Sequence, residues 1–62
     1  MSQKIITKGN RAVVITSQDG RVQANLYVNA RNGIADATIT PSRWTGKTVK
    51  GAEKWAAEKL AA

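Results

Sequence analysis

The chain contains no cysteine, no histidine and no phenylalanine, and it has one proline among its 62 residues. Without cysteine, neither a disulfide framework nor a thiolate metal site can stabilise the fold. Without histidine, the commonest general base and a frequent metal ligand are also missing. We therefore expect no metal, no cofactor and no enzymatic activity.

Acidic residues are scarce: four Asp and Glu stand against ten Lys and Arg, which gives a formal charge of +6. The four acids fall on a turn (Asp19), a sheet (Asp36) and a helix (Glu53 and Glu58), so they do not suggest a catalytic pair. The positive excess suits a polyanionic partner, most simply nucleic acid. RNA or an acidic protein would satisfy the same charge, so charge alone does not choose between them.

Long hydrophobic runs are absent. No apolar segment approaches the roughly 20 residues that span a bilayer, and the N-terminal segment lacks the hydrophobic stretch of a signal peptide. We expect a cytoplasmic protein without membrane contact. A chain of 62 residues forms one domain near the lower size limit for a stable core. Because that core is rich in alanine, a monomer or a weak homodimer is expected.

Two turn dipeptides, Asp19-Gly20 and Asn32-Gly33, separate three strand-like segments, 11–17, 21–29 and 34–40. Such dipeptides supply the two positive-φ positions of a type I′ turn, the strongest short-range signal for a β-hairpin. Two-residue turns predict a register for each hairpin. The first would pair Gln18 with Arg21, Thr16 with Gln23, Ile15 with Ala24 and Val13 with Leu26. The second would pair Arg31 with Ile34, Asn29 with Asp36, Val28 with Ala37 and Leu26 with Ile39.

Both registers place apolar residues on one side of the sheet and polar residues on the other, as in a half-buried antiparallel sheet. The predicted apolar side holds Val13, Ile15, Val22, Ala24, Leu26, Val28, Ala35, Ala37 and Ile39. The predicted polar side holds Thr16, Gln18, Arg21, Gln23, Asn25, Tyr27, Asn29, Arg31, Asp36, Thr38 and Thr40.

The rest of the chain completes an α+β domain over residues 11–62. Residues 1–10 form either a basic arm or a short N-terminal edge strand, with a turn at Gly9-Asn10. Pro41 should end the third strand because it has no N–H to donate, and residues 42–47 would form a loop. Thr48 is a suitable N-cap for a helix over residues 49–61. The fold class predicted is a three-stranded antiparallel sheet with one C-terminal helix packed on its apolar side.

Two tryptophans and one glycine are expected to lie in this helix or next to it. Trp55 belongs to the apolar stripe of the helix and is expected in the core. Trp44 either covers the core between the third strand and the helix or is an exposed anchor for a protein partner. Gly51 lies in the first helical turn, where a close approach to the sheet would explain it. Gly46-Lys47-Thr48 lacks the glycine spacing of a phosphate-binding loop, so we interpret it as the start of the helix.

The polar side of the sheet is the best candidate for a functional surface. Arginine pairs with the acceptors of guanine, and asparagine or glutamine with adenine, so this inventory suits reading of the major groove. Lysine and arginine at the margin would contact phosphates. The predicted base-reading set is Arg21, Gln23, Asn25, Tyr27, Asn29, Arg31 and Thr38, and the predicted phosphate contacts are Lys4, Lys8, Arg11, Arg43 and Lys47. Single-stranded nucleic acid is disfavoured because Tyr27 is the only aromatic residue predicted there.

The segment Lys47-Thr48-Val49-Lys50-Gly51-Ala52-Glu53-Lys54-Trp55 resembles a pattern of small prophage and plasmid proteins, in which strands precede a Thr-capped helix with Gly-Ala and Trp. The order of elements resembles the three-strand-plus-helix DNA-binding domains of integrases and AP2-type factors. In those families the sheet lies in the major groove. The resemblance implies base reading by Arg21, Gln23, Asn25, Tyr27 and Asn29, with help from Thr38.

These observations predict a small basic module that binds double-stranded DNA through its polar sheet face, in a regulatory or recombination-accessory role. The alternative is a protein-interaction module, such as a phage-encoded inhibitor of a host protein. It would use the same face, an exposed Trp44 or an unpaired strand edge. A homo-oligomer that buries part of the sheet is a third possibility.

Overall fold

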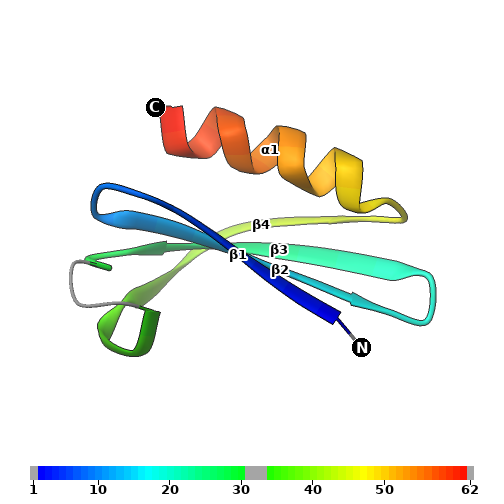
Figure 1. Ribbon diagram of the computed structural model, residues 1–62, viewed down its shortest axis with the longest axis horizontal. Helices are drawn as coiled ribbons and strands as arrows, with labels where there is room; N and C mark the ends of the chain where they lie inside the picture. Colours follow the sequence, from blue (N-terminus) through cyan, green and yellow to red (C-terminus); the bar gives the residue numbers. More distant parts are fainter. Residues whose placement is uncertain (1, 31–33, 62) are drawn as a thin grey trace.

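The computed structural model describes residues 2–30 and 34–61. Its strands form one antiparallel sheet in the order β1-β2-β3-β4, and a helix crosses one face of this strongly twisted sheet (Figure 1). The elements are β1 (Ser2–Lys8), β2 (Arg11–Gln18), β3 (Arg21–Val28), the short 3₁₀ helix η1 (Ile34–Asp36), β4 (Thr38–Gly46) and α1 (Val49–Ala61). The α+β class is confirmed, but the sheet has four strands instead of three, because residues 2–8 form an edge strand and not an arm.

The hairpin of β2 and β3 has the predicted register. Asp19 and Gly20 both have positive φ, at 52° and 77°, as a type I′ turn requires. All four predicted pairs, from Gln18 with Arg21 to Val13 with Leu26, are present. The turn at Gly9-Asn10 is also confirmed, and it pairs Lys8 with Arg11.

The predicted third strand and its register are wrong. Strand β3 ends at Val28, Asn29 adopts a left-handed φ of 59°, and the N–H of Ala30 donates to the carbonyl of Asn10 at 2.8 Å. The chain therefore leaves the sheet, and residues 34–36 form η1. When β4 begins at Thr38, Ile39 lies opposite Tyr27 instead of Leu26. A shift of one residue moves a side chain to the other face. The predicted Asn32-Gly33 turn lies outside the described residues.

The prediction that Pro41 ends the third strand is wrong. Pro41 lies within β4. Tyr27 pairs with Ile39 and Asn25 with Arg43, so the residues 40–42 stand opposite the single residue Leu26. This irregularity is a β-bulge, one of the few places in a sheet that accept proline. The hydroxyl of Thr40 donates to the carbonyl of Leu26 at 2.9 Å and accepts from the N–H of Ser42 at 3.2 Å. The side chain of Thr40 thus replaces ladder hydrogen bonds that the bulge cannot form.

Helix α1 begins as predicted. The hydroxyl of Thr48 accepts from the N–H of Gly51 at 3.2 Å, which is an N-cap interaction. A Cβ at position 51 would lie 2.8 Å from Cζ2 of Trp44, so the predicted close approach of this turn to the sheet is confirmed. Trp44 and the half-buried Trp55 both pack against the core. The interpretation of Trp44 as a core residue is therefore correct, and the exposed-anchor interpretation is wrong.

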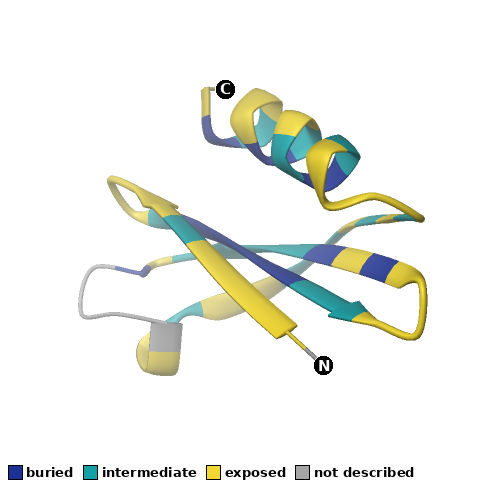
Figure 2. Cartoon of the chain, turned by 45° about the vertical axis from the view of Figure 1, so that its right-hand side comes forward, coloured by how far each residue is buried: buried dark blue, intermediate teal, exposed yellow. Residues whose placement is uncertain are grey.

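The core lies between α1 and the sheet. In Figure 2, dark blue marks the buried residues of the two central strands and those on the side of α1 that is turned toward the sheet. The buried members of the core are Val13, Ile15, Val22, Ala24, Ala52, Ala56 and Leu60. With 13 residues, α1 is too short to cross a membrane, and the described part of the chain offers no other helix that could.

Candidate nucleic-acid interface

The sheet face turned away from α1 is called the open face. The pairing of the strands assigns its members, because residues directly opposite one another share a face. Three cross-strand rows run from β1 to β4: Gln3-Thr16-Gln23-Thr45, Ile5-Val14-Asn25-Arg43 and Thr7-Ala12-Tyr27-Ile39. Gln18 and Arg21 extend the open face at the β2–β3 turn.

Five of the predicted site residues meet on the open face. Four of them, Arg21, Gln23, Asn25 and Tyr27, alternate along β3, and Arg43 of β4 lies opposite Asn25. Arg21, Gln23 and Arg43 are exposed, whereas Asn25 and Tyr27 are half-buried. Arg43, predicted to contact phosphate at the margin, lies on the edge strand β4, in the middle one of the three rows.

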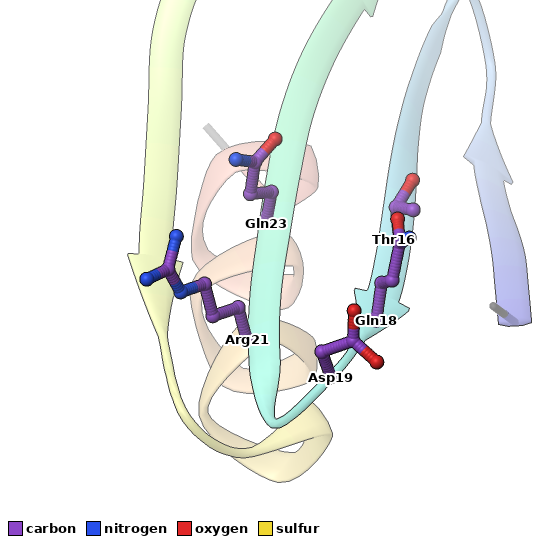
Figure 3. A pocket seen from close by; sticks show the side chains of 5 residues that line it. All are labelled: Thr16, Gln18, Asp19, Arg21 and Gln23. Carbon is purple, nitrogen blue, oxygen red and sulfur yellow. The ribbon is translucent and has the colours of Figure 1, made fainter.

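The turn end of the open face is hollowed. A pocket of about 470 Å³ is lined by Thr16, Gln18, Asp19, Arg21 and Gln23. In Figure 3, Arg21 extends toward β4, the Asp19 carboxylate lies on the side of β2, and α1 is behind the sheet. The pocket therefore presents a guanidinium, two amides, a hydroxyl and a carboxylate from one rigid hairpin. Such a set can donate to and accept from the edges of bases.

Three predicted phosphate contacts lie on the side of α1 instead. Lys4 forms an ion pair with Glu53 of α1, with its Nζ 3.2 Å from Oε2. Arg11 donates from Nη1 to the carbonyl of Lys59 at 3.2 Å, near the C-terminal end of α1, where a cation is favourable. Lys8 pairs with Arg11 and shares its side of the sheet. Lys4 and Lys8 have no predicted register, because it depends on the strand β1. For Arg11, the alternation of β2 already indicates the side of Val13 and Ile15, which is the side of α1.

The remaining predicted residues lie elsewhere. Thr38 pairs with Val28 and so shares a face with Val28 and not with Tyr27. Asn29 is exposed beyond the end of β3. Lys47 follows β4 and lines a second pocket with Arg21, Gln23 and Thr45, at the margin of the open face. Arg31 lies outside the described residues.

The open face also contains apolar residues that the sequence analysis did not assign to it. Ala12 and Val14 are buried there, while Ile5 and Ile39 are exposed by 46% and 56% on the two edge strands. The uninterrupted apolar segment 12–15 was a signal for β2, because a strand covered on both faces loses its alternation. No local signal placed Ile39, since its face depends on where the chain re-enters the sheet, with Thr38 opposite Val28.

Searches of family models, curated proteins and solved structures find no match to this chain. The resemblance to three-strand-plus-helix DNA-binding domains therefore stays a prediction. Those domains have three strands, whereas this sheet has β1 as a fourth.

Proposed function

We propose that this protein binds double-stranded DNA through the open face, with β3 lying along the major groove. The observation that supports the proposal is the line of Arg21, Gln23 and Asn25 on one strand, with Arg43 beside it on β4. Arginine is suited to guanine, and glutamine and asparagine to adenine. A regulatory or recombination-accessory role would follow from binding alone.

The side chains of β3 cover several base pairs. Open-face residues two positions apart on a strand are separated by about 6.7 Å, so Arg21, Gln23 and Asn25 together span about 13 Å. The major groove, about 12 Å wide, also admits a two-stranded ribbon such as β3 with β4.

The test is fluorescence anisotropy with a labelled duplex of mixed sequence, titrated at several salt concentrations. The logarithm of the affinity should fall against the logarithm of the salt concentration, with a slope of about −0.9 for each phosphate contact. We expect the double variant Arg21→Ala/Arg43→Ala to weaken binding by about tenfold or more. The slope should fall by about one phosphate contact, that of Arg43, whereas the loss of Arg21 should relax the preference for guanine.

The double variant Lys50→Ala/Lys54→Ala is the matched control. It also removes two positive charges, but it removes them from α1, on the opposite side of the sheet. Its duplex affinity should stay close to that of the unchanged protein. Equal losses in the two variants would indicate attraction by net charge without an interface. No binding at low salt would reject the proposal.

A protein-interaction module is the second candidate, and the exposed Ile5 and Ile39 on the open face favour it. Ile39 lies directly opposite Tyr27 on that face, and tyrosine is enriched in protein interfaces. If the protein does not bind double-stranded DNA, a protein partner should co-purify with the unchanged protein. The Ile39→Ser variant should then lose that partner. The version of this hypothesis that used Trp44 is wrong, because Trp44 packs against the core.

A further inference from the structure

The two edges of the sheet differ in their ability to accept another strand. Strand β4 is interrupted by the bulge at residues 40–42 and by Pro41, both of which protect an edge from pairing. Strand β1 pairs with β2 in unbroken register from Ser2 to Lys8 and contains no proline. Within the described residues, β1 is therefore the edge that remains suited to pairing.

The hydrogen-bonding groups that β1 presents outward follow from its hairpin. The two-residue turn Gly9-Asn10 makes Lys8 and Arg11 the hydrogen-bonded pair next to the turn. Hydrogen-bonded and non-hydrogen-bonded pairs alternate along an antiparallel ladder. The N–H and C=O groups of Gln3, Ile5 and Thr7 accordingly point away from β2. All three side chains lie on the open face.

We propose that two copies of this chain pair antiparallel through β1, with the two-fold axis at Ile5. Ile5 would then pair with the partner's Ile5, and Gln3 with the partner's Thr7. Each such pair exchanges two backbone hydrogen bonds, so the three outward residues of both copies are satisfied. The result is one continuous eight-stranded sheet. This inference goes beyond the proposed function and does not depend on DNA binding.

A second copy of the chain fits the outer edge of β1, because the outward backbone groups of this strand are symmetric about Ile5. An isologous contact requires a self-complementary surface of this kind. Ile5 is 46% exposed, and against the partner's Ile5 this apolar surface would be covered. Lysine on an edge strand opposes pairing through its charge, but Lys4, the lysine nearest the axis, is neutralised by Glu53 on the side of α1.

The chain has no cysteine, so a single introduced thiol reports the pairing. The two residues at the axis would have Cα atoms about 5.5 Å apart, within the range of about 4.4–6.8 Å that a disulfide spans. We expect Ile5→Cys to form a disulfide-linked dimer under mild oxidation. The matched control is Ile39→Cys, at a similarly exposed isoleucine on β4, and it should stay largely monomeric. Equal cross-linking of both variants would reject the proposal.

Sedimentation equilibrium of the Cys-free protein gives the second readout. The Ile5→Pro variant removes an outward N–H together with the isoleucine side chain. The ladder between β1 and β2 stays intact, and a native circular dichroism spectrum is expected. Its dimer should dissociate at a concentration about tenfold higher or more. Ile5→Thr keeps the N–H and should weaken the dimer less. A protein that stays monomeric up to millimolar concentration, or a proline variant that dimerises unchanged, would overturn the inference.

Discussion

The indole of Trp44 determines how closely β4 and the first turn of α1 approach each other. Two glycines make room for it. A Cβ at Gly51 would lie 2.8 Å from Cζ2 of the ring, and a Cβ at Gly46 would overlap Cη2. Neither glycine has a φ in the left-handed region, so what each supplies is space. The sequence signalled the close approach at Gly51 because glycine weakens a helix, but it gave no sign for Gly46.

Gly46→Ala is therefore expected to destabilise the protein by about 1–3 kcal/mol, the usual cost of overpacking a well-filled site. Urea denaturation would measure the change in the free energy of unfolding. In a Trp44→Leu background the obstructing ring is gone, and the same substitution should cost less than about 0.5 kcal/mol, since the two sites interact directly. Identical costs in both backgrounds would show that Trp44 is not the obstacle.

At the scale of elements, the hairpin of β2 and β3 was predictable because its register depends on a two-residue turn. Asp19 and Gly20 fix the turn, and alternation fixes the faces. The pairing of β3 with β4 was not predictable in this way. It depends on a hydroxyl–carbonyl contact between Thr40 and Leu26, 14 positions apart, and on a bulge around Pro41. The base-reading residues of β3 were found because they belong to the local hairpin, whereas Arg43 depends on the bulge.

Thr40→Val tests whether that hydroxyl holds β4 in its register. Valine has nearly the same shape but leaves the carbonyl of Leu26 and the N–H of Ser42 without their partner. We expect a loss of about 1–3 kcal/mol in the free energy of unfolding. Faster hydrogen exchange at the amide of Ser42 should accompany it. Thr45→Val, at an exposed position of the same strand, is the control and should change stability by less than about 0.5 kcal/mol. A neutral Thr40→Val would mean that other groups fix the bulge.

At the scale of the whole molecule, small residues let α1 lie close to the sheet. Ala52 and Ala56 of the helix and Ala24 of β3 are all fully buried. At each end of α1 a polar contact supports this packing, from Lys4 to Glu53 and from Arg11 to the carbonyl of Lys59. The Lys4–Glu53 pair is exposed and adds little. The alanine contacts therefore dominate the position of the helix, and with it the strand twist that shapes the open face.

Ala56→Val should push α1 away from the sheet. Valine at a helical position costs up to about 0.7 kcal/mol in propensity, and overpacking adds about 1–3 kcal/mol. A domain of this size has a total stability of only about 3–9 kcal/mol, so the melting temperature should fall markedly. Ala57→Val is the matched control, because the neighbouring position is exposed on the same helix and has only the propensity cost. Equal losses at positions 56 and 57, measured by calorimetry, would show that the helix can move without loss of stability and that the core tolerates larger side chains.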